Sequence, residues 1–259
     1  MNTVEVRGLV IRTVDIKETD RLITIFTEQM GVVTALAQSA RSLKSRKMAA
    51  TMQFCYGNYV LYRRGDKYFV KEAELIESFF DIRQSIDGLA LANYIAEVLS
   101  DVTVEESDNE LLRLSLNSLY AISTAKFDFD KIKAVFEIRT ASILGFMPDV
   151  LACHRCKEQG GEFFFDIMGG SIECFKCHQD SKEMHTEYEF DHERKVLCIL
   201  SAGAKVALGY SIYSPVERVF SFNIGDDDMR LFSRATEEYL LNHLGRSYKS
   251  LDFYKEIKR

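Results

Sequence analysis

The chain has 259 residues, of which 47% are hydrophobic and 28% are charged, and its formal net charge is −6. This composition excludes an intrinsically disordered chain, and the length predicts two or three domains. No apolar run approaches the ~20 residues that span a bilayer, and the first residues do not form a secretory signal. We therefore expect a cytoplasmic protein whose six cysteines are reduced.

The first 80 residues predict five short strands, because they are rich in Val, Ile, Thr, Tyr and Phe and are interrupted by turn residues. The expected strands cover residues 4–14, 21–27, 32–38, 53–62 and 68–77. Five short strands fit a small closed barrel, which leaves no exposed sheet edge. An OB-type barrel, a fold that binds single-stranded nucleic acid, is favoured, and an SH3-like barrel is the alternative.

The negative net charge hides a basic segment within this barrel. Between Gln29 and Lys71 the chain has eight basic residues and one acid, Asp66. A local basic surface on an acidic protein is typical of polyanion binding, although a solvated surface without a ligand has the same composition. The predicted phosphate-binding residues lie in the loop after the third strand and in the following hairpin; they are Arg41, Lys44, Arg46, Lys47, Arg63, Arg64 and Lys67.

After Phe80 the apolar residues recur at helical spacing. Capping boxes are expected at Ser107–Glu110 and Ser214–Glu217, and three aspartates should begin the last long helix. The expected helices cover 89–99, 107–120, 130–143, 193–208 and 226–244. We expect them to pack as one bundle, interrupted by an insertion.

The insertion carries two C-x₂-C pairs, Cys153/Cys156 and Cys174/Cys177. Two residues between thiols let both sulfurs reach one ion, so this spacing predicts a four-thiolate zinc site. Four thiolates complete the tetrahedron and leave no position for a reactive water, so we expect one structural zinc ion. Glycine pairs flank residues 162–166, which predicts a short hairpin between the two pairs.

The other candidate residues have ordinary structural interpretations. His154 and His178 adjoin the cysteine pairs and are expected to be exposed loop histidines, while Cys55 and Cys198 are expected to be buried thiols. Several barrel aromatics could stack on bases. Strand aromatics are more often part of the core, so one or two surface stackers are expected among Tyr56, Tyr59, Tyr62, Tyr68 and Phe69.

Motifs along the whole chain resemble those of the RecO family of bacterial recombination mediators. The N-terminal motifs are Arg7-Gly-Leu-Val-Ile-Arg12, Glu18-Thr-Asp20, Ile25-Phe-Thr-Glu28, Gly31-Val-Val-Thr-Ala-Leu-Ala37 and the basic run 40–47. Further motifs are Phe136-Glu-Ile-Arg139, Leu144-Gly-Phe-Met-Pro148, the four cysteines, Leu241-Asn-His-Leu244 and Lys249-Ser-Leu251. Ser39 departs from the pattern, because the family is expected to have glycine before Ala40-Arg41.

The resemblance implies an α+β multidomain protein with an N-terminal OB-type barrel (1–80), a mainly helical domain (81–149 and 181–259) and an inserted zinc module (150–180). It also implies a nucleoid-associated protein that binds and anneals single- and double-stranded DNA and helps to load the RecA recombinase onto DNA coated by single-stranded DNA-binding protein. The implied partners are RecR and the acidic C-terminal tail of the coating protein.

That tail requires a hydrophobic pocket beside a cation. Arg139 lies near the apolar stripe of the helix over 130–143 and is the predicted tail-binding residue, whereas Lys131 and Lys133 are expected to be solvated. Pairing of Arg139 with an acid of the same acidic segment is the alternative.

The sequence contains no phosphate-binding loop and no recognisable catalytic triad or carboxylate pair, which predicts a protein that is not an enzyme. Two other classes remain as alternatives. One is a zinc-ribbon interaction adaptor that does not bind DNA directly, and the other is a metallohydrolase, against which the four thiolates argue.

Overall fold

The computed structural model describes residues 3–102, 109–184 and 196–258. These residues form two compact units, one made of residues 1–126 and 248–259 and the other of residues 127–247. We call them the barrel unit and the module unit. The three-domain boundaries expected from the sequence remain a prediction.

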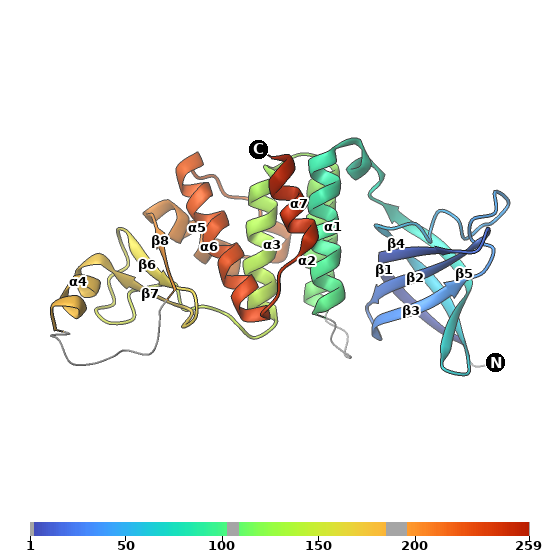
Figure 1. Ribbon diagram of the computed structural model, residues 1–259, viewed down its shortest axis with the longest axis horizontal. Coiled ribbons are helices and arrows are strands. Elements are labelled where there is room, and N and C mark those ends of the chain that lie inside the picture. Colours follow the sequence, from blue (N-terminus) through green and yellow to red (C-terminus); the bar gives the residue numbers. More distant parts are fainter. Residues whose placement is uncertain (1–2, 103–108, 185–195, 259) are drawn as a thin grey trace. The chain divides into compact units, whose positions relative to one another are not determined.

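The barrel unit begins with five strands that close into a barrel in the order β1-β2-β3-β5-β4, with β4 paired back to β1 (Figure 1). All the pairings are antiparallel except that of β3 with β5. The five-stranded OB-type barrel predicted from the sequence is confirmed. The strands are β1 (Thr3–Ile16), β2 (Asp20–Thr27), β3 (Gly31–Ala37), β4 (Cys55–Arg64) and β5 (Lys67–Ser78).

Strict alternation along β4 places every second side chain inside the barrel. Tyr59 and Leu61 are among the buried residues, together with Ile23 and Ile25 of β2. The Tyr59 hydroxyl donates a hydrogen bond of 2.7 Å to the carbonyl of Ala50, which fixes the long loop between β3 and β4 against the core.

Ser39 begins this loop in a left-handed backbone conformation, with φ = 54°. That conformation favours glycine, which explains why glycine is expected at this position. The Ser39 N–H donates to Asp20 Oδ1 at 2.8 Å and thereby holds the loop on the turn between β1 and β2. The departure at Ser39 therefore changes the residue but not the conformation of the loop.

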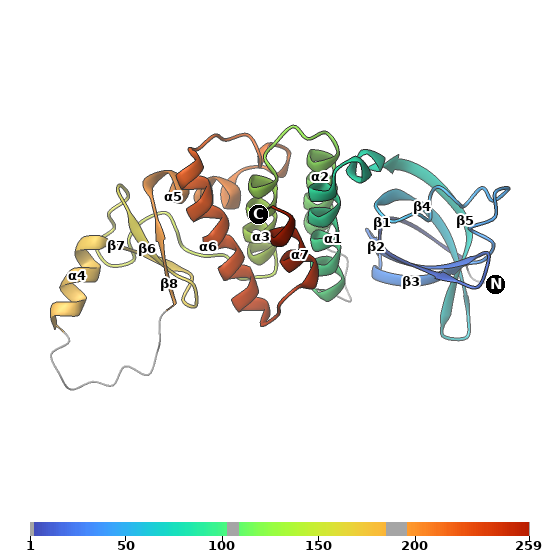
Figure 2. The same cartoon turned by 45° about the horizontal axis from the view of Figure 1, so that its top comes forward.

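The helices of the barrel unit are η1 (Phe80–Gln84), α1 (Ile86–Asp101), α2 (Asn109–Ser123) and α7 (Lys249–Ile257). The Ser85 hydroxyl accepts a hydrogen bond from the Gly88 N–H and so caps α1. The C-terminal α7 lies along α1 (Figure 1 and Figure 2), where the Ser250 N–H donates to Glu97 at 3.1 Å. The first two residues of the first expected capping box, Ser107 and Asp108, lie outside the described residues.

The module unit contains α3 (Phe129–Ile143), α5 (Ala202–Tyr213), η2 (Val216–Arg218) and α6 (Asp226–Leu244), with α3 and α6 packed together. Three aspartates form the first turn of α6, as predicted. The second expected capping box is wrong, because Ser214 ends α5 and η2 has no side-chain cap. The helices divide between the two units, with α1, α2 and α7 in one and α3, α5 and α6 in the other.

The helix expected over 193–208 is wrong over residues 197–200, and its residues 193–195 lie outside the described residues. Leu197–Leu200 form strand β8, and α5 begins only at Ala202. Strand β8 pairs with β6 (Phe163–Asp166), which also pairs with β7 (Ser171–Cys174), in a three-stranded sheet of order β7-β6-β8. An apolar run of four residues suits a strand or a helix equally well. The partner strand β6, which lies far away in the sequence, decides between them.

Lys131 and Lys133 are buried, which corrects the expectation that they are solvated. The Lys133 Nζ lies 3.0 Å from Glu137 Oε1 and 2.8 Å from Glu237 Oε2, between α3 and α6. Lys131 donates to the carbonyl of Phe222 and lies 4.9 Å from the centroid of its ring. Each ammonium group has a partner about a hundred residues away, Phe222 for Lys131 and Glu237 for Lys133, so helical periodicity alone does not reveal their burial.

Two carboxylates therefore share one buried ammonium. Burial raises the pKa of Glu137 to about 7, although Lys133 opposes this shift. The folded protein thus holds a proton that the unfolded chain releases near pH 4.5, and the free energy of unfolding should fall as the pH rises from about 5 to 7. The Glu137→Gln variant should lose this part of the pH dependence, on the order of 1–3 kcal/mol. Urea denaturation of both proteins across this range is the measurement, and parallel pH profiles would contradict the prediction.

Candidate nucleic-acid interface and metal centre

The four paired cysteines converge at one end of the three-stranded sheet. Strands β6 (Phe163–Asp166) and β7 (Ser171–Cys174) form the predicted hairpin, and α4 (Phe175–Met184) follows directly. The turn of the hairpin is closed by Asp166, whose Oδ1 accepts hydrogen bonds from the N–H groups of Met168 and Gly169. Cys174 thus ends β7, Cys177 lies in the first turn of α4, and Cys153 and Cys156 come from the preceding loop.

The sulfur positions fit a tetrahedral metal ion. The ligand atoms of the four cysteines all lie within 4.8 Å of one another, and the Sγ atoms of Cys156 and Cys174 are 3.6 Å apart. A zinc ion at about 2.3 Å from each thiolate requires sulfurs about 3.8 Å apart. The cluster therefore brings all four predicted ligands close enough to share one metal ion.

Backbone N–H groups point at these sulfurs, as is expected around bound thiolates. The Cys174 N–H donates to Cys153 Sγ at 3.4 Å, and the Cys177 N–H donates to Cys174 Sγ at 3.5 Å. Burial disfavours the Cys153 thiolate, but backbone N–H donors lower its pKa to about 6. Cys153 is fully buried and Cys156 is exposed, so the cluster lies at the edge of the module.

The histidines beside the cysteines are not ligands in this arrangement. His154 is exposed, as predicted, and its Nδ1 lies 3.2 Å from the carbonyl of Ile172. His178 is not an exposed loop residue: it lies on α4, only 13% of its side chain is exposed, and its Nδ1 is 3.2 Å from Glu173 Oε2. Its ring also contacts Phe164, with 4.1 Å between the ring centroids. His178 therefore helps to hold α4 on the hairpin.

The expectations for the two isolated cysteines are confirmed, because Cys55 and Cys198 are both buried free thiols. The Cys198 thiol donates to Glu238 Oε2 at 2.8 Å, and burial together with this carboxylate raises its pKa to about 12. Neither thiol is poised to act as a nucleophile.

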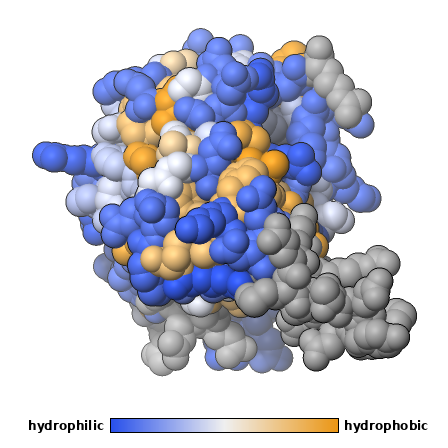
Figure 3. Space-filling view, turned by 90° about the vertical axis from the view of Figure 1, so that its left-hand side faces the viewer, coloured by the Kyte–Doolittle hydropathy of each residue, from blue (hydrophilic) through white to orange (hydrophobic). Residues whose placement is uncertain are grey.

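The surface at the module end mixes apolar and hydrophilic residues (Figure 3). One face of the sheet is buried, and its residues Phe163, Phe165 and Ile172 have no exposed surface. Strand β8 packs against α6. Large apolar side chains are also exposed in this region, namely Leu151, Met168, Phe175, Val196 and Ile199.

The predicted DNA-binding residues of the barrel separate into two groups. Three of them are held by the protein: Arg41 by Asp15 and the carbonyls of residues 17 and 18, Lys47 by the carbonyl of Val70, and Arg63 by Asp66. The other four are exposed and have no partner among the described residues; they are Lys44, Arg46, Arg64 and Lys67.

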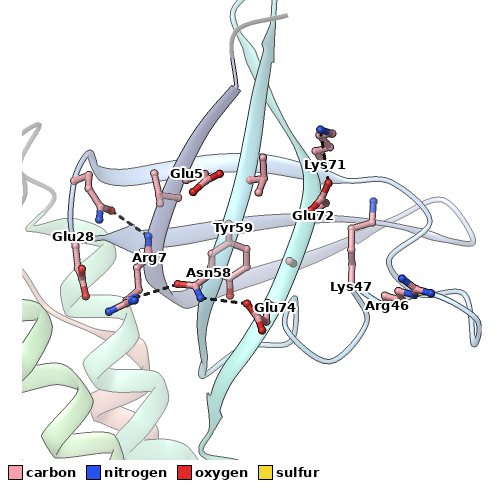
Figure 4. Close-up of a pocket in the computed structure, with 14 residues that line it drawn as sticks. Glu5, Arg7, Glu28, Arg46, Lys47, Asn58, Tyr59, Lys71, Glu72 and Glu74 are labelled. Atoms are coloured by element: carbon pink, nitrogen blue, oxygen red, sulfur yellow. Dashed lines mark hydrogen bonds and ion pairs between the residues drawn. The ribbon is translucent and has the colours of Figure 1, made fainter.

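A groove of about 1110 Å³ lies on the outer face of the barrel, between the basic loop and strands β1, β4 and β5 (Figure 4). Asn58 at its centre accepts a hydrogen bond from Arg7 and donates one to Glu74. The groove is lined by as many acids as bases, namely Glu5, Glu28, Glu72 and Glu74 with Arg7, Arg46, Lys47 and Lys71.

The sequence prediction did not include the acids that β5 contributes to this groove. The basic segment ends at Lys71, and these acids begin directly after it, at Glu72. Their alternation along β5 is a signal that could have revealed them, since residues two apart share one face of a strand. The exposed cations therefore lie on the loop and the hairpin, whereas the groove itself is not basic.

Arg139, the predicted tail-binding residue, is half-buried on α3. Its guanidinium donates to the carbonyls of Ile212 and Ser214, at the C-terminal end of α5. A cation at this position compensates the negative end of the helix dipole. Arg139 thus has a structural role in joining α3 to α5.

Comparisons with known proteins agree over the whole chain. Residues 1–79 match the family model for the recombination protein O N terminal, and residues 83–188 match that for its C terminal. The DNA repair protein RecO of Acetivibrio thermocellus is 33% identical over 100% of this chain and 99% of its own length. The chain belongs to the RecO family. The RecO proteins of Caldicellulosiruptor saccharolyticus and Clostridium kluyveri are 26% and 29% identical, over 100% and 86% of this chain and 100% and 88% of their own lengths.

The two RecO family models cover the barrel and the cysteine cluster in turn. The N-terminal model covers the barrel, and the C-terminal model covers all four cysteines. None of the helices in the described ranges is both long and apolar enough to cross a bilayer.

Replacing Cys174 with Ser tests the metal centre of this RecO family member. The change removes one of four thiolate ligands and should lower the zinc content, while the barrel, in the other unit, keeps its stability. Zinc measured by atomic emission, together with thermal unfolding, is the readout. Cys198→Ser is the matched control, because it removes a buried thiol of the same unit outside the cluster. Equal zinc content in Cys174→Ser and wild-type protein would contradict the assignment.

Proposed function

We propose that this chain is a DNA-binding recombination mediator and not an enzyme. It binds and anneals single- and double-stranded DNA, and together with RecR it helps to load RecA onto DNA coated by single-stranded DNA-binding protein. The proposal rests on full-length membership of the RecO family. We place its action in the cytoplasm, at the nucleoid.

The observation that carries the proposal is the group of exposed barrel cations that have no side-chain partner in the described parts of the chain. Lys44 and Arg46 project from the loop before β4, and Arg64 and Lys67 flank the β4–β5 hairpin. Cations that are not neutralised within the protein are available to displace counterions from phosphates. Phosphates carry no base identity, so this binding is expected to be independent of sequence.

The zinc ion has a structural role in this proposal. The four cysteines would hold it in a closed tetrahedron, and the bound ion would fix the loop of Cys153 and Cys156 against the β6–β7 hairpin and α4. With four thiolates in place, no position is left for a water molecule or a substrate. The cluster therefore has the role of holding the surface of this end of the module unit in place, and not of catalysing a reaction.

The phosphate contacts are tested with the double variant Lys44→Ala/Arg46→Ala. Each lost contact should reduce the slope of log affinity against log salt by about 0.7 for a single strand, so the double variant should lose about 1.4. Fluorescence anisotropy with two unrelated oligonucleotides is the measurement, and both should weaken equally. Annealing of complementary strands coated with single-stranded DNA-binding protein should slow in parallel.

Arg230→Ala is the matched control, because Arg230 is an exposed arginine of the module unit, paired with Asp227. If the double variant keeps the wild-type slope, the DNA path lies elsewhere on the chain. If the wild-type protein binds no DNA at any salt concentration, a zinc-containing interaction adaptor becomes the better description.

We also propose that Arg139 contributes to binding the acidic tail of the coating protein. The proposal is supported by its position, because Arg139 is a half-buried cation beside the apolar residues of α3 and next to the C-terminal end of α5. Arg139→Glu should weaken binding of the tail peptide at least ~10-fold, the effect of losing one charge-assisted contact, and should spare binding of naked DNA.

Anisotropy with a labelled tail peptide measures this effect. Arg139→Lys is the control, since it keeps the charge beside α5, and thermal unfolding of both variants reports any loss of the α3–α5 junction. Unchanged peptide affinity in a folded Arg139→Glu protein would remove this residue from the tail site.

A further inference from the structure

The outer face of the β4–β5 ribbon carries an aromatic pair followed by a cationic pair. Tyr62 of β4 lies directly opposite Phe69 of β5, and Arg64 lies opposite Lys67. The pair between them, Arg63 and Tyr68, belongs to the other face, because residues two apart on a strand point the same way. Leu61 and Val70, the preceding pair, are both buried inside the barrel. Both the aromatic and the cationic pair therefore face outward.

The two rings are stacked, with 5.3 Å between their centroids and 18° between their planes. Both side chains are partly exposed, and the Tyr62 hydroxyl has no hydrogen-bond partner among the described residues. The hydroxyls of the other two tyrosines of β4 already make hydrogen bonds within the protein, Tyr56 to Glu28 and Tyr59 to the carbonyl of Ala50. Within the described ranges, the stacked pair thus combines a hydroxyl without a partner and neighbouring cations without partners.

The cations beside the rings are also available. Asp66, the acid of this hairpin, lies 3.4 Å from Arg63, whereas Arg64 and Lys67 are exposed and have no partner in the parts of the chain that the structure describes. Two residues of strand, about 7 Å, separate the aromatic pair from the cationic pair. That distance is comparable with the distance from a base to its own phosphate.

We propose that Tyr62 and Phe69 form a stacking site for an unpaired nucleobase, with Arg64 and Lys67 holding the adjoining phosphate. The inference rests on the proposed DNA-binding function and adds its substrate class at this position, which is a single strand. A duplex hides the faces of its bases within its own stack, so it can contact the cations but not the rings.

The acids on the same face limit the path of the strand. In the opposite direction from the hairpin, the next outward pair is Val60 with Glu72, and Glu5 of β1 lies opposite Val60. Glu74 follows, opposite Asn58. These carboxylates disfavour a phosphate backbone within the groove. The bound DNA strand is therefore confined to the hairpin end of the ribbon. Lys47, whose Nζ lies 3.3 Å from the carbonyl of Val70, adds a cation at this end.

The sharpest test uses the absence of tryptophan from the chain. In the full-length Phe69→Trp protein the indole is the single tryptophan, and it keeps an aromatic face at the site. Its emission should be quenched when oligo(dT) binds, because stacking on a base quenches indole fluorescence. A duplex of the same length and inorganic polyphosphate should quench it much less. Equal quenching by polyphosphate would overturn the stacking site.

The double variant Tyr62→Leu/Phe69→Leu gives a second readout that keeps the apolar bulk of the pair. Affinity for oligo(dT) should fall about 5- to 150-fold, the range for losing stacking on one base, while affinity for the duplex and the salt slope should not change. Thermal unfolding checks that the barrel is intact.

The two proposals fail in different ways. If wild-type protein binds oligo(dT) with a normal salt slope and the leucine variant binds equally well, the stacking site is wrong and the DNA-binding function stands. If wild-type protein binds neither oligo(dT) nor duplex, the function fails as well.

Discussion

The pairing of β4 with both β1 and β5 is the constraint on which the surface of the barrel depends. Closure of the barrel fixes the register of β4, and the register decides which side chains of this strand lie inside. A shift of one residue would turn Tyr59 and Leu61 outward and bury Tyr62. The buried pair Leu61 and Val70 thus anchors the outward pair beside it, and the chemistry of the outer face follows from the packing of the inner one.

The same closure sets the charge of that face. The basic loop between β3 and β4 approaches β5, as the contact of Lys47 with the carbonyl of Val70 records. The outer residues of β5 after Lys71 are acidic, so the groove has cations on the loop side and carboxylates on the sheet side. A polyanion is therefore favoured at the loop and the hairpin, and disfavoured along the strands. The groove is therefore a boundary of the predicted DNA path.

In the module unit, the small sheet that carries the four-cysteine cluster packs against the helices. The hairpin of β6 and β7 gains its third strand from β8, which packs on α6. Phe165 contacts Tyr239 of α6, with 5.2 Å between the ring centroids. The sheet is thus anchored to the helices on one side, and the four clustered thiols lie at its other end, between the exposed loop and α4. A metal ion held by these thiols would join the loop and α4 to the sheet, and its removal would loosen that end first.

The sequence by itself determined the features that depend on local pattern. Alternation and turn residues located all five barrel strands, because a strand with one buried face repeats every two residues. The C-x₂-C spacing identified the four thiols, since two ligands of one ion must be close in the chain. The motifs identified the RecO family, which the full-length comparisons confirm.

The tertiary structure decided the features that depend on a distant partner. Leu197–Leu200 became a strand because β6 offers an edge, and Lys133 became buried because Glu237 of α6 supplies a second carboxylate. Arg139 lies against α5, which a pattern confined to α3 cannot reveal. The net charge of the barrel groove likewise depends on charged residues that come from separate strands and from the basic loop. Local spacing reports which residues share a face, but the neutralisation of a charge depends on which face comes to lie against it, and only the folded chain determines that.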